Sequence, residues 1–272
     1  WSRGLGDVYK RQRLVRAALG VVVCALVAYL FAETLFVWLA QPLIRAWQEA
    51  GLGPPRLHFA NPIEPFFTYL KIALVVGLFA ASPIVFYQLW RFVAPGLYRR
   101  EKKYALPFAA LSGFCFLGGA CFGYFIVFPI GFRFFLGFAN DNMGSMQQLL
   151  GRSLRVSAGQ PFELTPTLMM GEYFGLVWRL LLAFGLVFEL PLVVVFLARA
   201  GLVNHRSLWR FNRYFIIVAF TLGAMLTPPD VITQAMMSAP LVVLYNLSIL
   251  FAWIFERRRQ RRKRTGDDAP AR

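Results

Sequence analysis

Charged residues, acids, cysteines and histidines are all scarce in this sequence. Only 15% of its 272 residues are charged and 58% are hydrophobic, whereas a typical soluble domain has about 25% charged residues. The three cysteines all lie in apolar runs, where cysteine usually behaves as a small hydrophobic side chain, so no disulfide framework is expected. With only His58 and His205 in the chain, a histidine-based metal or catalytic cluster is not expected either, and no cofactor is predicted.

The scarcity of acids leaves a strongly basic chain. There are 29 lysines and arginines but only 13 acids, which gives a net charge of +16. Such an excess can indicate nucleic-acid binding, but these bases lie between apolar runs and near the C-terminal end, and they form no stripe on a soluble core. Together with a mean hydropathy of +0.56, this pattern predicts an all-α integral membrane protein that contacts the lipid bilayer and does not bind nucleic acid.

Six apolar segments are predicted to cross the membrane as helices, because about 20 apolar residues span the hydrocarbon core. They are residues 14–39, 65–92, 106–138, 169–198, 214–226 and 235–255. The fifth has only about 13 residues, or roughly 20 Å of helix against a core of about 30 Å. Pro42, Gly51 and Pro54 are predicted to end the first helix, and the segment from there to Glu64 is predicted to lie outside the membrane. Glycines of the third segment are expected to let neighbouring helices approach closely: Gly113, Gly118, Gly119 and Gly123.

The basic residues also predict how the chain is oriented. All but seven of the 29 lie in the N-terminal segment, in residues 89–103, in the loop that ends at Arg213 or in the C-terminal segment. Loops rich in lysine and arginine stay on the cytoplasmic side, so both termini are predicted to be cytoplasmic. Residues 1–12 begin without methionine and show no periodic apolar pattern, and are interpreted as a non-native or truncated terminus. Residues 13–256 are then the six-span membrane domain, and residues 257–272 a basic, disordered tail.

Glu189 lies in the middle of the apolar run 180–198. An ionised carboxylate at that depth costs roughly 2.5–3.5 kcal/mol on insertion scales. One interpretation is a protonated or hydrogen-bonded glutamate that fixes helix packing. The other is a functional group that faces a cavity or a partner, and Pro191 slightly favours it, because a break in a helix tends to line a cavity.

Three other acids have simpler interpretations on charge pattern alone. Glu101 lies among five bases in residues 89–103, which is typical of a surface acid paired with its neighbours and worth under about 1 kcal/mol. Glu64 and Asp230 are predicted to be solvated loop or helix-capping residues.

Four motifs in fixed order change this interpretation. They are Asn-Pro-Ile-Glu-Pro-Phe-Phe-Thr-Tyr-Leu-Lys at 61–71, Phe-Val-Ala-Pro-Gly-Leu-Tyr-Arg-Arg-Glu-Lys-Lys at 92–103, Phe-Gly-Leu-Val-Phe-Glu-Leu-Pro at 184–191 and Leu-Thr-Pro-Pro-Asp-Val-Ile-Thr-Gln at 226–234. The sequence from about Arg13 to Phe255 closely resembles the TatC family, the core membrane subunit of the twin-arginine protein translocase. The order of the motifs between six spans makes the resemblance specific.

The resemblance implies a receptor in the bacterial cytoplasmic membrane and not an enzyme. TatC-like proteins form a concave bundle of six helices that binds twin-arginine signal peptides of folded precursors from the cytoplasm. They assemble with single-span TatA-type and TatB-type subunits and with other TatC copies, and the proton-motive force drives export. Glu101 matches the carboxylate that contacts the arginine pair, and Phe92 an aromatic beside it. The remaining signal-peptide-binding positions implied are Arg13, Leu14, Pro95 and Tyr98.

The resemblance also gives roles to residues of the later spans. Glu189 matches an intramembrane glutamate on the concave face. Thr227 and Gln234, together with Asp230 between them, match polar positions near the outer ends of the fifth and sixth spans, where the single-span partners dock. The short fifth span is expected to thin the bilayer locally.

Three features depart from the family pattern. The glutamate that precedes the first span in relatives is Tyr9 here, which is expected to weaken precursor binding. Asn246 stands where many relatives carry an acid, and residues 140–166 form a longer connection than expected. The alternative function is a proton-coupled secondary transporter that uses Glu189, although the two halves of the sequence show no convincing repeat of the kind such folds have.

Overall fold

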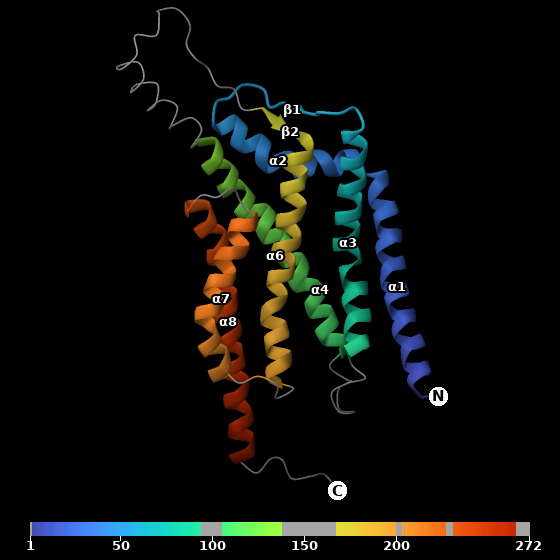
Figure 1. Ribbon diagram of the computed structural model, residues 1–272, viewed down its shortest axis with the longest axis vertical. Coiled ribbons are helices and arrows are strands. Elements are labelled where there is room, and N and C mark those ends of the chain that lie inside the picture. Colours follow the sequence, from blue (N-terminus) through green and yellow to red (C-terminus); the bar gives the residue numbers. More distant parts are fainter. Residues whose placement is uncertain are drawn as a thin grey trace, which may run out of the picture. The chain divides into compact units, whose positions relative to one another are not determined.

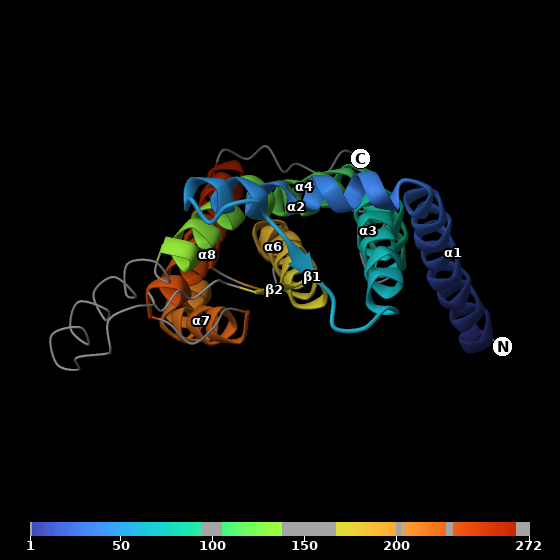
Figure 2. The same ribbon diagram turned by 90° about the horizontal axis from the view of Figure 1, so that it is seen from above.

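The computed structural model describes residues 2–93, 105–137, 167–199, 203, 205–226 and 231–264. Its helices are α1 (Ser2–Leu30), α2 (Ala32–Glu49), α3 (Glu64–Val93), α4 (Ala105–Phe122), the π-helix η3 (Gly123–Val127), α6 (Met170–Arg199), α7 (His205–Leu226) and α8 (Val231–Arg264) (Figure 1). Residues 128–137 continue the helix after η3. The only strands among the described residues, β1 (Leu57–His58) and β2 (Leu168–Met169), pair in parallel (Figure 2).

Five helical segments of the described residues are long and apolar enough to cross a membrane. They are Arg11–Leu30, Glu64–Arg91, Pro107–Gly137, Met170–Ala198 and Met237–Ile254. The predicted fifth span belongs to α7, which begins at His205 and carries Arg206, Arg210 and Arg213 before its apolar half. The predicted all-α fold with several membrane helices is confirmed.

The first predicted span is wrong at its C-terminal end. The first helix ends at Leu30, and a separate amphipathic helix, α2, follows from Ala32 and continues through Pro42. Proline has no N–H, so the carbonyl of Trp38 loses its usual helical partner. The hydroxyl of Tyr124 donates a hydrogen bond to that carbonyl at 2.5 Å. A side chain far along the chain thus makes a proline tolerable where the sequence predicts a break.

The C-terminal end of the chain also differs from the prediction. α8 continues to Arg264, so the basic residues 257–264 are helical and not part of a disordered tail. Arginine, lysine and glutamine are good helix formers, and neither glycine nor proline interrupts the chain between Pro240 and Gly266.

The described residues divide into two compact units. Unit 1 comprises residues 1–21, 79–120 and 182–272, and unit 2 comprises residues 22–78 and 121–181. The helices α1, α3, α4 and α6 each contribute residues to both units.

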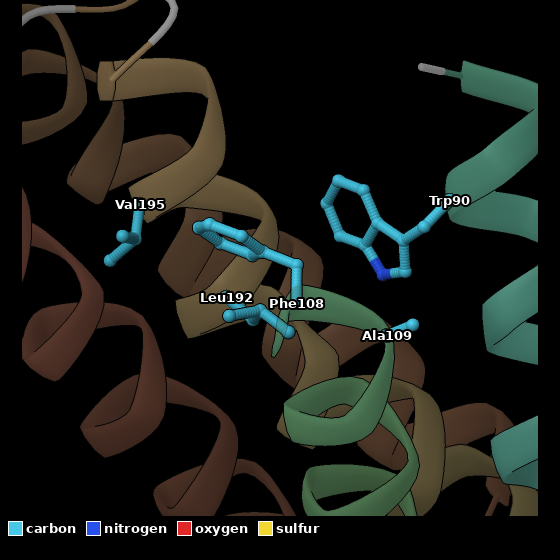
Figure 3. Close-up of a cluster of buried hydrophobic side chains, with 5 residues drawn as sticks. All are labelled: Trp90, Phe108, Ala109, Leu192 and Val195. Carbon is cyan, nitrogen blue, oxygen red and sulfur yellow. The ribbon is translucent and has the colours of Figure 1, made fainter. Parts of the chain in front are cut away.

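The centre of unit 1 is a cluster in which α3, α4 and α6 meet (Figure 3). Trp90 of α3 points toward Phe108 and Ala109 of α4, and the rings of Trp90 and Phe108 lie 5.3 Å apart. Leu192 and Val195 of α6 complete the cluster. The indole N–H of Trp90 donates to the hydroxyl of Ser112 at 2.8 Å, so this aromatic side chain is fixed by a polar contact as well as by packing.

Farther along the same helices, glycine lets α4 and α6 come into backbone contact. A Cβ atom at Gly119 would clash with the carbonyl oxygen of Phe184, and one at Gly185 would lie 2.7 Å from the ring of Phe116. Gly113 similarly contacts Pro83 of α3, where a Cβ would be 3.1 Å from the proline Cα. The predicted role is confirmed for Gly113 and Gly119, whereas nothing lies within 4 Å of a Cβ at Gly118.

The second pair of helices in unit 1 is α7 and α8, which lie side by side in both views (Figures 1 and 2). The hydroxyl of Ser238 donates to the carbonyl of Ala219 at 3.1 Å, and the hydroxyl of Tyr245 to that of Leu208 at 3.1 Å. At the other end, His205 Nδ1 lies 2.7 Å from a carboxylate oxygen of Glu256.

Unit 2 is held together by polar contacts between distant segments. The hydroxyl of Tyr173 donates to the carbonyl of Leu39 at 2.9 Å, which attaches α6 to α2. Glu64 accepts hydrogen bonds from the backbone N–H groups of Ala60 at 2.8 Å and Gly171 at 2.6 Å. The prediction of a merely solvated or capping Glu64 is therefore incomplete, because its carboxylate joins the start of α3 to the start of α6.

We expect Gly119→Ala to destabilise the protein by about 1–3 kcal/mol, the usual effect of overpacking, because the new methyl group meets backbone that cannot rotate away. The matched control is Gly118→Ala, one residue earlier in the same helix, which should be neutral or stabilising by up to about 1 kcal/mol through helix propensity. Thermal unfolding of the purified chain in one detergent measures both. Equal effects of the two substitutions would contradict the described helix contact.

The contact between His205 and Glu256 predicts a pH dependence. The hydrogen bond from the His205 side chain lowers the pKa of the Glu256 carboxyl below its usual range. Because this pKa is lowered in the folded state, the stabilisation is present above the usual carboxyl pKa and is lost as the pH falls through the lowered value. Glu256→Gln should therefore lower the unfolding temperature at pH 7 and have progressively less effect in acid. A difference that persisted unchanged at low pH would contradict this assignment.

Candidate functional site

Glu189 is a buried carboxylate where α6 packs on α4. Its side chain is 7% exposed, and its Oε1 atom has no hydrogen-bond partner among the described residues. The hydroxyl of Ser112 and the backbone of Phe116, both on α4, interact with the carboxylate. Ser112 is fully buried and also accepts the indole bond of Trp90, so the three side chains form one polar chain across α3, α4 and α6.

The position of Glu189 follows from the glycine contact between these helices. Gly119 of α4 meets Phe184 of α6, whereas Ala109, earlier in α4, packs with Leu192, later in α6. The two helices are therefore antiparallel, and Glu189 comes opposite the turn of α4 that holds Ser112. Both interpretations of Glu189 find support here. Groups of α4 interact with its carboxylate, which favours a role in helix packing, and its Oε1 atom has no hydrogen-bond partner among the described residues, which favours a role in binding.

The predicted signal-peptide-binding residues are described only in part. Arg13 of α1 is 6% exposed, and its Nη1 donates to Gln88 Oε1 of α3 at 2.9 Å. Leu14, the next residue, is 74% exposed. The backbone of Phe92 lies in the last turn of α3, but its side chain lies outside the described residues, as do Pro95, Tyr98 and Glu101.

The described residues bring Arg13 close to the end of α3. Gln88 is one helical turn before Phe92, so its bond to Arg13 attaches α1 to the end of α3 from which residues 94–103 continue. Sequence analysis missed Gln88, because an uncharged polar residue near a helix end carries no signal of its own. Its partner is 75 residues away.

The predicted partner-binding positions are also partly described. Gln234 of α8 donates through its Nε2 to the carbonyl of Phe220 of α7 at 2.9 Å. Thr227 and Asp230 lie outside the described residues, so a capping role of Asp230 stays a prediction. Asn246, where an acid was expected from the resemblance, accepts a bond from Asn212 at 3.1 Å, and an acid could accept the same bond.

The chain matches one protein-family model, that of TatC, the Sec-independent protein translocase protein, over residues 10–240. It belongs to the TatC family. The matched range includes Glu101, Glu189, Thr227 and Gln234. Members of this family are membrane components of a protein translocase and not enzymes, as predicted.

Similarity to individual TatC proteins extends over nearly the whole chain. The protein is 45% identical over 259 residues to TatC of Desulforapulum autotrophicum, covering 95% of this chain and 86% of that protein. It is 35% identical over 244 residues to TatC of Koribacter versatilis, covering 89% and 82% of the two chains. A crystal structure of the twin arginine translocase receptor TatC matches with a TM-score of 0.73 at 35% identity, covering 92% of this chain and 98% of that one.

In this TatC chain, the described residues contain no group of histidines, cysteines and acids that could hold a metal ion. The described residues of the candidate site are Glu189, a buried carboxylate on α6, and Arg13, a buried arginine of α1 that bonds to Gln88 near the end of α3.

We expect Ser112→Ala to destabilise this TatC protein by about 1–3 kcal/mol, because it leaves the indole N–H of Trp90 without its acceptor and removes a partner of Glu189. Ser248→Ala is the matched control, since Ser248 is equally buried but bonds only to the carbonyl of Leu244 in its own helix, 2.7 Å away. Thermal unfolding in detergent measures both. A Ser248 variant as destabilised as the Ser112 variant would contradict a polar chain that extends through Ser112.

Proposed function

We propose that this protein is the receptor subunit of a twin-arginine translocase and binds signal peptides that carry two adjacent arginines. The observation that carries the proposal is the motif at 92–103, with its single carboxylate Glu101, in a chain of the TatC family. The bond of Arg13 to Gln88 supports it, because it holds α1 beside the end of α3 from which this motif continues.

Glu101 is the residue that recognises the arginine pair. A carboxylate and a guanidinium form two parallel charge-assisted hydrogen bonds, a geometry that the single ammonium of lysine does not reproduce. The five bases of residues 89–103 lower competition from nonspecific cations at this site. Phe92, Pro95 and Tyr98 belong to the same motif of the sequence, and the exposed Leu14 of α1 offers an apolar contact to the signal peptide.

The apolar part of the signal peptide then lies along α6 near Glu189. The unpartnered Oε1 of Glu189 supports this step, because a buried polar atom without a partner is costly and gains free energy from any donor that a ligand brings. A transporter function for Glu189 is disfavoured by membership of the TatC family.

TatA-type and TatB-type subunits bind at α7 and α8. Both helices present large apolar side chains that are exposed on this chain, among them Ile217 and Met225 of α7 and Val243 of α8. Polar contacts come from the region where α7 ends and α8 begins in the sequence, from Thr227, Asp230 and Gln234. Both termini are cytoplasmic, other TatC copies complete the assembly, and the proton-motive force drives export.

The test places a photoreactive group at position 92 and adds precursors whose signal peptides carry either two arginines or two lysines. We expect strong capture of the arginine form and about tenfold less capture of the lysine form, the effect of losing one charge-assisted bond. Glu101→Gln should reduce capture of the arginine form equally.

The matched control is Glu33→Gln, which removes the same charge from an exposed site on α2 and should leave capture unchanged. Equal capture of both precursors, or equal effects of the Glu101 and Glu33 substitutions, would refute the proposed recognition site.

A further inference from the structure

A cavity of about 990 Å³ lies in unit 2 between α2 and the helical residues 123–133. α2 lines it with residues at helical spacing, from Thr34 through Trp38 and Gln41 to Arg45. The opposite wall includes Tyr124, Phe125, Ile126, Pro129, Ile130 and Arg133. None of these residues has a role in the proposed recognition of signal peptides.

Two contacts hold the walls of this cavity in register. At one end, the hydroxyl of Tyr124 bonds to the carbonyl of Trp38, and the two rings stack with their centroids 4.3 Å apart. At the other end, Arg133 forms an ion pair with Glu49 at 2.6 Å. The two contacts are about three helical turns apart on α2 and about two and a half on the opposite wall, or roughly 14–16 Å at the rise of an α-helix. The cavity is therefore a built feature of two helices that run in the same direction.

The charge of the cavity is positive and gathered at one end. Arg133 is neutralised by Glu49. Arg45 also lines the cavity, is exposed, and takes part in none of the ion pairs found between described residues. The amide of Gln41 lies one turn before it on the same face of α2. This end offers a free guanidinium and an amide to an anionic ligand.

The other end of the cavity is apolar and open. Val37, Phe125 and Ile126 line it and are all exposed. Phe125 and Ile126 belong to the candidate membrane span Pro107–Gly137, and their exposed apolar side chains suit contact with hydrocarbon. Trp38 lines the same end, and its ring is of the amphipathic kind that is common at the membrane boundary.

We propose that this cavity binds one anionic phospholipid, with the phosphate at Arg45 and Gln41 and an acyl chain along Val37, Phe125 and Ile126. A small soluble anion would use only the charged end, and a partner helix would place an apolar stripe against Arg45. A lipid has both required parts in the required order, because its anionic phosphate matches the guanidinium of Arg45 and its acyl chain matches the apolar end.

The test uses the whole chain of 272 residues in detergent with equal amounts of phosphatidylglycerol and phosphatidylcholine, and counts retained lipids by native mass spectrometry. We expect phosphatidylglycerol to be retained in preference. Arg45→Gln should reduce its retention about tenfold, as for loss of one charge-assisted hydrogen bond. Val37→Trp should reduce it as well, because the larger side chain fills the apolar end without changing the charge.

The matched control is Arg56→Gln, which removes the same charge from an exposed residue outside the cavity and should leave retention unchanged. Equal retention of the two lipids, equal effects of Arg45→Gln and Arg56→Gln, or full retention by Val37→Trp would each overturn the proposal. Thermal unfolding in lipid-free detergent should be the same for the wild type and Arg45→Gln. If that variant unfolds early, the Val37→Trp result decides.

Discussion

Close contact between α4 and α6 at Gly119 is the constraint on which unit 1 depends. Two helix backbones can approach this closely only where at least one of them carries no side chain at the contact, and here the carbonyl of Phe184 occupies the space of the missing methyl group of Gly119. This contact sets the register of the antiparallel pair. The same register brings Glu189 opposite Ser112 and gathers Trp90, Phe108 and Leu192 into one cluster. The polar chain through Ser112 is therefore a consequence of glycine placement as much as of the polar residues themselves.

In unit 2 the equivalent constraint is that a freed backbone carbonyl must find a donor. Pro42 removes the partner of the Trp38 carbonyl, and Tyr124 replaces it. The phenol of Tyr124, which supplies the missing donor, also stacks on the indole of Trp38 and fixes one end of the cavity. Stability and the binding surface thus depend on one side chain, so the proline in α2 is part of the architecture and not a defect.

Much of the fold was predictable because hydropathy is a local signal. The apolar segments, the burial of Glu189 and the basic clusters all follow from residues that are neighbours in sequence. The failures have a common cause in contacts between distant residues. The sequence predicts a helix break at Pro42 because the compensating tyrosine is 86 residues away from Trp38. It predicts a solvated Glu64 because the second backbone donor to this carboxylate is 107 residues away.

The candidate site divides in the same way into residues that the sequence indicates and residues that only contacts between distant segments reveal. Family resemblance located the acidic and aromatic positions, but Gln88 emerged only once α1 was seen beside α3. In the sequence, Arg45 is one of the seven bases outside the four basic segments and carries no further signal. The cavity it lines requires two helices placed in parallel, which no periodicity in either helix predicts.

The π-helix η3 has a consequence for how this protein tolerates change in length. A π turn holds one residue more than an α turn, and each residue of an α-helix turns the chain by about 100°. Deleting one residue within Gly123–Val127 would let the segment revert to regular α geometry. The residues around Tyr124 would still be apolar. Because one complete turn remains, every later side chain, Arg133 included, would point as it does now, whereas the same deletion in the regular helix after Val127 would rotate the later side chains by about 100°. The direction in which this helix points its side chains, more than its composition, thus decides whether the guanidinium of Arg133 meets Glu49 or the lipid.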